Sequence, residues 1–249
     1  MRAMILAILL AGAVPMAAYA VPADVKASVA ATAARSPENV KLDESRKPAE
    51  VLKFLGLQQG MWVADPFGSN LYWAEITAPA VGPKGRVTIW EPKQFYDQKG
   101  YDRLTAYAAK QPNVFMRVSP METPDLPGKY DFMLINLDYH DVYWESAKYG
   151  IVKMDPDQWL KVIYDSMKPG AVVGVIDHVA NPGDTRDTVQ KLHRIDPNTV
   201  KADFKKAGFV LEAESKILRN PGDDHSLLVF DPKIRGKTDR FIFKFRKPR

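Results

Sequence analysis

Three of the four histidines stand next to an aspartate, a pairing that can do proton-transfer chemistry. The pairs are His140-Asp141, Asp177-His178 and Asp224-His225. An imidazole beside a carboxylate can take a proton from a nucleophile. The same residue types can hold a metal ion, and His140, His178 and nearby aspartates could serve as ligands, although no short-range spacing such as HExxH supports this. For His140 and His178, a structural role is as well supported as a chemical one. For His193 and His225, the structural role is favoured.

Acidic residues also follow three apolar runs. Asp65, Glu91 and Asp138 each come directly after a short run of the kind that forms a buried strand. An acid after the second strand of an α/β sheet usually accepts hydrogen bonds from the ribose hydroxyls of a nucleotide-like ligand. Acids are equally common in this position as loop residues or helix caps, and the sequence leaves both interpretations open for Glu91.

The composition excludes several kinds of chemistry. The chain of 249 residues has no cysteine, which excludes disulfide scaffolds, cysteine-ligated zinc, iron–sulfur clusters and cysteine nucleophiles. It carries neither the GxSxG elbow of hydrolases nor a GxxxxGK(S/T) phosphate loop. The formal net charge of +5 is modest, and we expect a small-molecule substrate rather than a nucleic-acid partner.

The first twenty residues have the pattern of a secretory signal peptide. Arg2 is a basic n-region, residues 3–14 are an apolar h-region, and the sequence AYA at 18–20 is a small-x-small cleavage site. We expect cleavage after Ala20 and a mature protein that is periplasmic or secreted, with no stable membrane insertion. The oligomeric state stays open.

Apolar runs and helix signals alternate along the rest of the chain. Helices are predicted where capping residues and spaced apolar residues coincide, at 43–57, 71–80, 94–110, 155–167 and 196–208. Strands are predicted at 61–64, 86–90, 114–118, 132–137, 171–176 and 209–217, with two further candidates at 227–230 and 241–245. The sequence KPG at 168–170 predicts a turn, and residues 178–195 predict a loop.

This alternation predicts a doubly wound α/β fold. Strands that are apolar throughout are typical of parallel sheets covered by helices on both faces. We therefore expect a mainly parallel, seven-stranded sheet whose last strand is antiparallel. The domain prediction is a signal peptide at 1–20, a helical lead-in at 21–42 and a single α/β domain at 43–249. Ligands of such sheets bind beyond the carboxyl ends of the strands, where the acids and histidines above are expected.

Three segments resemble those of class I S-adenosylmethionine-dependent methyltransferases. They are GLQQGMWVADPFGSN (56–70), VGPKGRVTIWEP (81–92) and KPGAVVGVIDH (168–178). A second set resembles, more narrowly, a group of exported proteins classed as methyltransferases: LDYHD (137–141), IDHVANPG (176–183), LHRID (192–196) and KTDRFIFKF (237–245). The resemblance covers residues 40–249 and implies the Rossmann-like methyltransferase fold.

The resemblance also implies a cofactor and a reaction, namely S-adenosylmethionine and methyl transfer to a small-molecule or envelope substrate. The implied cofactor-binding residues are Asp65, Phe67, Gly68, Ser69, Asn70, Glu91 and Asp138. The implied catalytic residues are His140, Asp141 and His178, with His140 as the base. Tyr139 or Trp73 could lie against the cationic sulfonium.

The loop after the first strand departs from the family pattern and keeps other functions open. That loop is rich in glycine in the family, whereas residues 65–71 hold only Gly68, and Leu71 stands where a glycine is expected. A Cβ restricts φ and keeps the backbone away from a ligand. S-adenosylmethionine is also made in the cytosol, away from an exported enzyme. One alternative is a non-catalytic binding protein that kept the fold and lost the cofactor, and a lesser one is a metal-dependent enzyme that uses strand-end histidine and aspartate.

Overall fold

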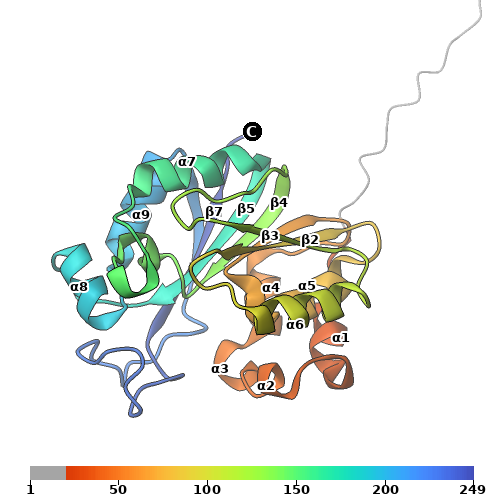
Figure 1. The fold of residues 1–249 in the computed structure, drawn as a ribbon, viewed down its shortest axis with the longest axis horizontal. Helices are drawn as coiled ribbons and strands as arrows, with labels where there is room; N and C mark the ends of the chain where they lie inside the picture. Colours follow the sequence, from red (N-terminus) through yellow and green to blue (C-terminus); the bar gives the residue numbers. More distant parts are fainter. Residues whose placement is uncertain (1–20) are drawn as a thin grey trace, which may run out of the picture.

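A seven-stranded β-sheet lies between two layers of helices in residues 21–249, the part of the chain that this computed structural model describes (Figure 1). The strand order is β3-β2-β1-β4-β5-β7-β6. The predicted signal peptide, residues 1–20, lies outside the described part. Within the described part, no helix is long and apolar enough to cross a membrane.

Strands β1 to β5 pair in parallel, and β7 runs antiparallel to both of its neighbours. The bounds are β1 (Trp62–Pro66), β2 (Arg86–Pro92), β3 (Val114–Ser119), β4 (Tyr130–Asn136), β5 (Met167–His178), β6 (Val210–Ser215) and β7 (Arg240–Arg246). Strands β1, β2 and β4 are buried along most of their length, which explains their continuous apolar sequence. The predicted fold class, a mainly parallel seven-stranded sheet with an antiparallel last strand, is confirmed.

The described residues hold nine α-helices and four short 3₁₀ helices. The α-helices are α1 (Val25–Ala30), α2 (Pro37–Val40), α3 (Asp43–Arg46), α4 (Pro48–Leu55), α5 (Ala74–Val81), α6 (Gln98–Ala108), α7 (Pro156–Ser166), α8 (Thr185–Leu192) and α9 (Pro197–Lys206). The 3₁₀ helices are η1 (Thr32–Ala34), η2 (Gly68–Asn70), η3 (His140–Tyr143) and η4 (Ala147–Tyr149). Asp155 and Asp196 cap α7 and α9 as predicted, each with a proline at the first helical position.

Each face of the sheet packs against its own group of helices. On one face, Trp159 of α7 and Phe204 of α9 belong to one buried cluster with the strands. On the other face, Leu52 of α4 and Ile76 of α5 belong to a second cluster. The predicted lead-in at 21–42 contains α1, η1 and α2, and α1 packs on α4 and α5. Because helices cover both faces, the strand ends are where side chains from several strands can meet a ligand.

The predicted helix over 43–57 is two helices, because the chain breaks at Lys47. Lys47 has φ 45° and ψ 54° and separates α3 from α4. Pro48 follows, and the residue before a proline is disfavoured in the right-handed helical region. The break lets α3 take its own direction, and it places Arg46 against the carboxyl end of the sheet.

Two local predictions near β5 are wrong. The predicted loop at 178–195 contains α8, whose first turn is capped by Asp184, which accepts the backbone N–H of Asp187. The predicted turn at 168–170 lies inside β5 instead, at an irregularity in its pairing with β4 where Gly170 has φ 80°. Helix α8 holds only two apolar residues, Val189 and Leu192, so the sequence gives too short an apolar pattern to predict a helix.

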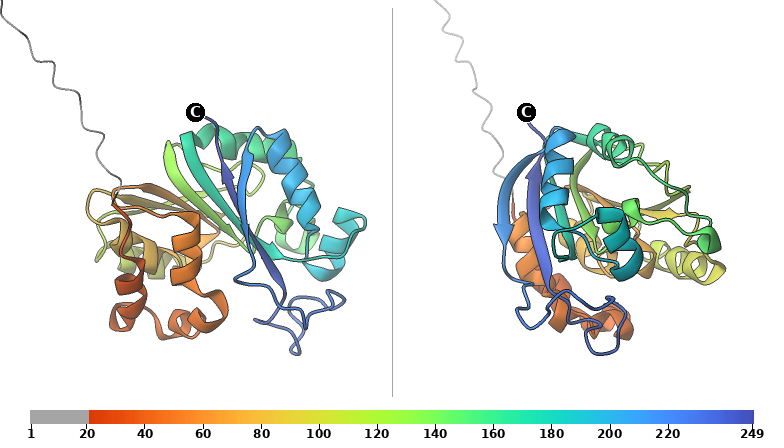
Figure 2. Two further views of the ribbon diagram at one scale, coloured as in Figure 1. Left: turned by 180° about the vertical axis from the view of Figure 1, so that it is seen from behind. Right: turned by 90° about the vertical axis from the view of Figure 1, so that its left-hand side faces the viewer.

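The predicted strand at 227–230 is also wrong, because its backbone is bonded to groups outside the sheet. The carbonyl oxygen of Leu227 accepts a hydrogen bond from Arg194 Nε at 2.9 Å, and the N–H of Val229 donates to the carbonyl oxygen of Leu192. These residues lie in the long connection between β6 and β7. Figure 2 shows this connection (blue) at the same end of the sheet as α2 and α3 (orange).

Arg194 anchors that connection, and its removal is expected to destabilise the fold. The side chain is fully buried, and Nη1 and Nη2 donate to the Asp223 carboxylate at 2.8 and 3.1 Å. Arg194→Ala leaves the buried Asp223 carboxylate without its cation, with only the backbone N–H groups of His225 and Asp239 as partners, which is expected to lower the free energy of unfolding by about 3–5 kcal/mol in urea titrations. Arg235 is exposed and serves as the control. Arg235→Ala is expected to change the free energy of unfolding by less than about 0.5 kcal/mol. Equal losses in the two variants would show that the pair is not an anchor.

Candidate cofactor and catalytic site

Acidic residues end or follow four neighbouring strands at the side of the sheet where the carboxyl ends of the parallel strands lie, called this edge below. Asp65 lies in β1, Glu91 in β2 and Asp177 in β5, each near the carboxyl end, and Asp138 follows β4. The three strand acids are at most 3% exposed. The strand order changes direction between β1 and β4, and this switch point is where ligands of open α/β sheets bind. The structure therefore places the predicted acids together at the expected edge.

Asp65 is a buried acid with an unused oxygen. Its Oδ2 has no hydrogen-bond partner among residues 21–249. Burial, and secondarily the neighbouring Glu91 charge, raise the pKa of Asp65 to about 7. A Cβ on Gly68 would lie 2.7 Å from Asp65 Oδ2, so only glycine allows the loop to pass this close to the carboxyl group.

Glu91 is bonded to the loop that it was expected to face. Its Oε2 accepts the backbone N–H of Ser69 at 3.1 Å, and the carbonyl oxygen of Ser69 accepts from Arg103 Nη2 at 3.2 Å. Burial raises the pKa of Glu91 to about 7 despite the Ser69 hydrogen bond. Glu91, the predicted partner of ribose hydroxyls, is thus bonded to the backbone of Ser69 in this structure.

The loop between β1 and α5 keeps a glycine-like path without the glycines. Phe67 and Leu71 both adopt left-handed conformations, with φ 57° and 65°, on either side of η2. Such a conformation costs a non-glycine residue about 1–2 kcal/mol. The Phe67 ring packs edge-on against Trp90, with ring centroids 5.3 Å apart, and also contacts Phe95. Leu71 therefore occupies the position expected for a glycine and takes a glycine's backbone geometry.

A cavity of about 90 Å³ lies at the switch point between this loop and the segment after β4. Its lining includes Arg46, Asp65, Gly68, Asn70, Trp73 and Asp138. Three buried atoms of these side chains have no hydrogen-bond partner within residues 21–249: Asp65 Oδ2, Trp73 Nε1 and Arg46 Nη1. An unsatisfied buried polar group costs about 1–3 kcal/mol, so three around one cavity point to a polar ligand.

Arg46 is a residue of this cavity that sequence reasoning missed. It ends α3, and its guanidinium lies 4.3 Å from the centre of the Tyr72 ring. The Tyr72 hydroxyl donates to Asp43, which also pairs with Arg35 at 2.7 Å. The residues before β1 therefore hold a cation beside the acids. The only sequence signal is the Lys-Pro dipeptide that ends α3, and it does not specify the direction of the side chain.

His140 and its neighbours form a second cluster at the same edge. The Asp177 carboxylate accepts from His140 Nδ1 at 2.8 Å and from the His140 backbone N–H at 2.9 Å. Burial alone would lower the pKa of His140, but Asp177 and Asp141 outweigh it and raise that pKa to about 9. His193, weighed from sequence as a structural residue, lies with Nδ1 3.3 Å from His140 Nε2. Its place at the end of the unpredicted helix α8 is why it was missed.

The other predicted residues near the cluster face elsewhere. His178 Nδ1 lies 2.7 Å from Thr238 Oγ1, and its ring centroid is 6.0 Å from that of His140. Burial lowers the pKa of His178 to about 3, so the ring is neutral. Tyr139 is fully buried and donates to Asp203 at 2.8 Å, so it does not line the cavity at the switch point. Trp73 does line it.

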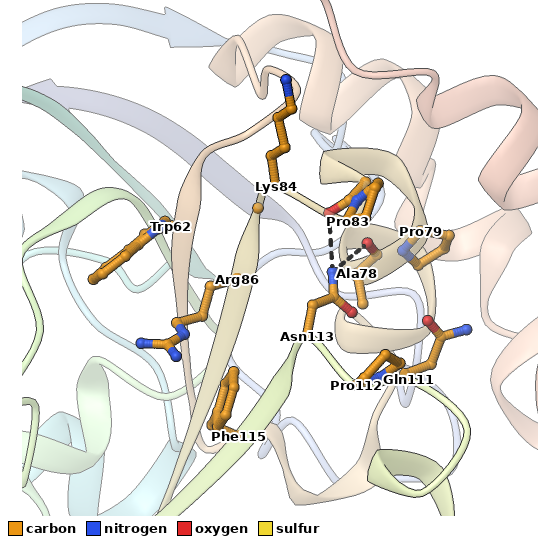
Figure 3. Close-up of a pocket in the computed structure, with 12 residues that line it drawn as sticks. Trp62, Ala78, Pro79, Pro83, Lys84, Arg86, Gln111, Pro112, Asn113 and Phe115 are labelled. Carbon is orange, nitrogen blue, oxygen red and sulfur yellow. Dashed lines mark hydrogen bonds between the residues drawn. The ribbon is translucent and has the colours of Figure 1, made fainter.

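A larger cavity, of about 530 Å³, lies at the opposite edge of the sheet. Trp62 and Arg86, at the amino ends of β1 and β2, line it together with Phe115 (Figure 3). The Arg86 guanidinium lies 4.9 and 4.2 Å from the centroids of the two rings. The strand-end acids do not reach this edge, so its size does not make it the chemical site.

Comparison with known proteins supports the fold assignment. No family model and no curated protein matches the sequence. Among solved structures, a SAM-dependent methyltransferase from Aquifex aeolicus is 18% identical with a TM-score of 0.57, over 90% of this chain and 98% of that one. A methyltransferase from Mesorhizobium loti is 12% identical with a TM-score of 0.57, over 83% and 100%.

The same fold also occurs in a protein with another activity. The [4+2]-cyclase SpnF is 16% identical with a TM-score of 0.55, over 82% of this chain and 80% of that one. The chain spans only 54% and 53% of the length of two further matched structures. These likenesses show that the chain has the fold of class I S-adenosylmethionine-dependent methyltransferases.

The raised pKa of Asp65 has a consequence for stability. Its folded pKa of about 7 lies above the ordinary value of 3.8, so the folded state binds the proton more tightly and stability falls as pH rises from about 4 to about 7. Asp65→Asn removes the buried charge. We expect it to raise the free energy of unfolding at pH 8 on the order of 2 kcal/mol and to have little effect at pH 4.

Urea titrations at the two pH values measure this difference. Asp102→Asn, at an exposed carboxylate of α6, is the control and is expected to show no such gain. An Asp65→Asn gain that is equal at pH 4 and pH 8 would contradict a buried, ionisable Asp65.

Proposed function

We propose that the chain is an S-adenosylmethionine-dependent methyltransferase that acts on a small-molecule or envelope acceptor after export. The observation that carries this proposal is the buried Asp65 carboxyl group with its unused oxygen, beside Glu91 and Asp138 at the switch point. Burial and the neighbouring Asp141 raise the pKa of Asp138 well above its ordinary range. Three neighbouring acids that are poorly solvated favour the binding of a cationic ligand. The predicted leader at 1–20 supports the export part of the proposal.

The charges around the cavity suit the amino-acid end of this cofactor. S-adenosylmethionine carries an ammonium, a carboxylate and a sulfonium cation. Arg46 offers a guanidinium to the carboxylate, while Asp65 and Asp138 offer acceptors to the cations. Trp73 brings an Nε1–H that has no hydrogen-bond partner among residues 21–249, and its ring can lie against a cation. Glu91 is the candidate acceptor for the ribose hydroxyls.

The cavity is too small for the whole cofactor, so binding requires the β1 loop to move. Pockets that hold drug-sized ligands have volumes of about 300–1,000 Å³, against about 90 Å³ here. The loop is suited to such a change, because Phe67 and Leu71 are strained and Glu91 is bonded to Ser69 rather than to a buried partner. Exchange of the Ser69 hydrogen bond for a ligand hydroxyl would keep Glu91 satisfied.

The cluster around His140 is the proposed place where the acceptor loses its proton. When bound, the cofactor supplies an electrophilic methyl group that an acceptor attacks in line. The chain aligns the acceptor and accepts its proton. His140 is oriented for this by Asp177, which holds Nδ1, so that Nε2 is the atom that gains or loses the proton; because the pKa of His140 is raised to about 9, only the deprotonated ring can take the acceptor's proton. Asp141 and His193 border Nε2, and His193 is the more exposed of the two rings.

A non-catalytic binding protein with the same fold is the second candidate. The observations that favour it are the engaged Glu91, the Phe67 ring packed on Trp90 and the small cavity. The cyclase SpnF shows that this fold is not tied to methylation, although that protein is itself an enzyme. The two candidates differ in one measurable property, which is affinity for the cofactor.

Calorimetric titration distinguishes them. The chain from Val21 is expected to bind S-adenosylmethionine and S-adenosylhomocysteine with one site. Glu91→Gln removes a charged acceptor, which is expected to weaken both affinities by about tenfold to 100-fold. Glu50→Gln, at an exposed acid of α4, is the matched control and is expected to bind as the wild type does. Absence of heat from both ligands, with folded protein at tens of micromolar, would overturn the methyltransferase proposal in favour of the second candidate.

A further inference from the structure

Three side chains beside the proposed catalytic edge have the donor atoms of a metal centre. His140 and Asp141 lie in η3, and His193 follows α8, which packs on η3. Their donor atoms form a nearly equilateral triangle. His140 Nε2 lies 3.3 Å from both Asp141 Oδ1 and His193 Nδ1, and the third edge, from Asp141 Oδ1 to His193 Nδ1, is 3.5 Å. All three atoms can therefore reach one point between them.

The triangle can hold either a proton or a metal ion. A carboxylate cannot donate, so His140 Nδ1 carries the hydrogen in its bond to Asp177. Nε2 is the atom that faces the triangle, either as an N–H directed at Asp141 Oδ1 or, once a metal ion displaces that proton, as a lone pair. Asp141 Oδ1 faces the same point. This oxygen is buried and makes no hydrogen bond with any residue of the described chain, 21–249. When Nε2 loses its proton, the three donor atoms all present lone pairs to one point, and a metal cation there offsets their repulsion.

The triangle has the dimensions of one face of a tetrahedral zinc site. Bonds of about 2.0–2.1 Å from a tetrahedral ion to nitrogen and oxygen place the ligand atoms about 3.3–3.4 Å apart. The measured edges of 3.3, 3.3 and 3.5 Å fall at this value. Two imidazoles and one carboxylate are also the ligand set of sites that keep a fourth position open.

The surroundings hold the three ligands in place. Asp177 accepts from the His140 ring, which is the carboxylate–histidine arrangement that orients metal ligands. Asp177 is held in turn by the backbone N–H groups of His140 and His178, at 2.9 and 2.7 Å. His193 is fixed by its N–H bond to the Val189 carbonyl oxygen at 2.9 Å. The three ligands thus come from η3 and from the end of α8, and Asp177 supports one of them, His140, through a hydrogen bond.

We propose that His140, Asp141 and His193 bind one divalent transition-metal ion, of which Zn²⁺ is the first probe. Three protein ligands leave a fourth position for water or for an oxygen of the substrate. An ion there lowers the pKa of a bound hydroxyl group, and His140 then acts as a ligand rather than as a base. The inference concerns metal binding, so it stands whether or not the chain binds S-adenosylmethionine.

Binding is measured with the untagged chain from Val21 after removal of metals with a chelator. Calorimetric titration with ZnCl₂ is expected to give one ion per chain, and Zn²⁺ is expected to raise the unfolding temperature. His193→Asn removes an imidazole while keeping a residue type that tolerates the left-handed backbone of this position, φ 50°. The loss of affinity is expected to exceed the roughly 10–100-fold that supporting-shell substitutions cost. Asp141→Asn, a second variant of nearly equal shape, is expected to lose affinity as well.

The matched control is His225→Gln, which removes an imidazole outside the cluster and is expected to leave Zn²⁺ binding unchanged. Each variant's circular dichroism spectrum and unfolding temperature without metal establish that it is folded. CoCl₂ provides an independent readout, because its visible absorption reports the coordination geometry of the bound ion. The proposal is overturned if the wild type binds neither ion, or if folded His193→Asn and Asp141→Asn bind Zn²⁺ as tightly as the wild type.

Discussion

Parallel strands end together, so the carboxylates that end or follow them must share one edge of the sheet. Four acids meet there: Asp65, Glu91, Asp138 and Asp177. The negative charge of Asp177 is balanced by His140. This partner holds the pKa of Asp177 below its ordinary range, against the effect of burial. In the described part of the chain, no cationic side chain forms a hydrogen bond with Asp65 or Glu91, and burial raises their pKa values to about 7. This imbalance makes the edge a receptor for positive charge, whether a proton, the Arg46 guanidinium or a cationic ligand.

The same edge contains the most strained part of the backbone. Phe67, Leu71 and Leu137, the last directly after β4, all have positive φ. At this edge, Gly68 relieves a close approach to the Asp65 carboxyl group. Strain of this kind is retained where the surrounding structure holds it, and it often marks a segment that changes conformation. The small cavity and the Ser69–Glu91 hydrogen bond are the basis of the proposal that the β1 loop moves when the ligand binds.

The fold and the positions of the strand-end acids could be predicted from the sequence, whereas the contact between His140 and His193 could not, and the reasons are physical. Buried parallel strands carry a continuous apolar signal, so Asp65 and Glu91 could be placed at strand ends from the sequence alone. The position of Arg46 depends on a break at Lys47 that redirects one short helix. The position of His193 depends on α8, whose sequence is mostly polar and holds only two apolar residues. Contacts between segments far apart in sequence leave no local pattern, and the two strongest additions to the site are of this kind.

A crystal structure of the chain with S-adenosylhomocysteine tests the central claim most directly. The account predicts the ligand at the switch point, with its amino-acid end between Arg46 and Asp65, and with Glu91 released from Ser69 to accept from the ribose. The β1 loop is then displaced from its present path, and Phe67 moves away from Trp90. A structure in which the ligand lies elsewhere, or in which Glu91 stays bonded to Ser69 at saturating ligand, would contradict the account.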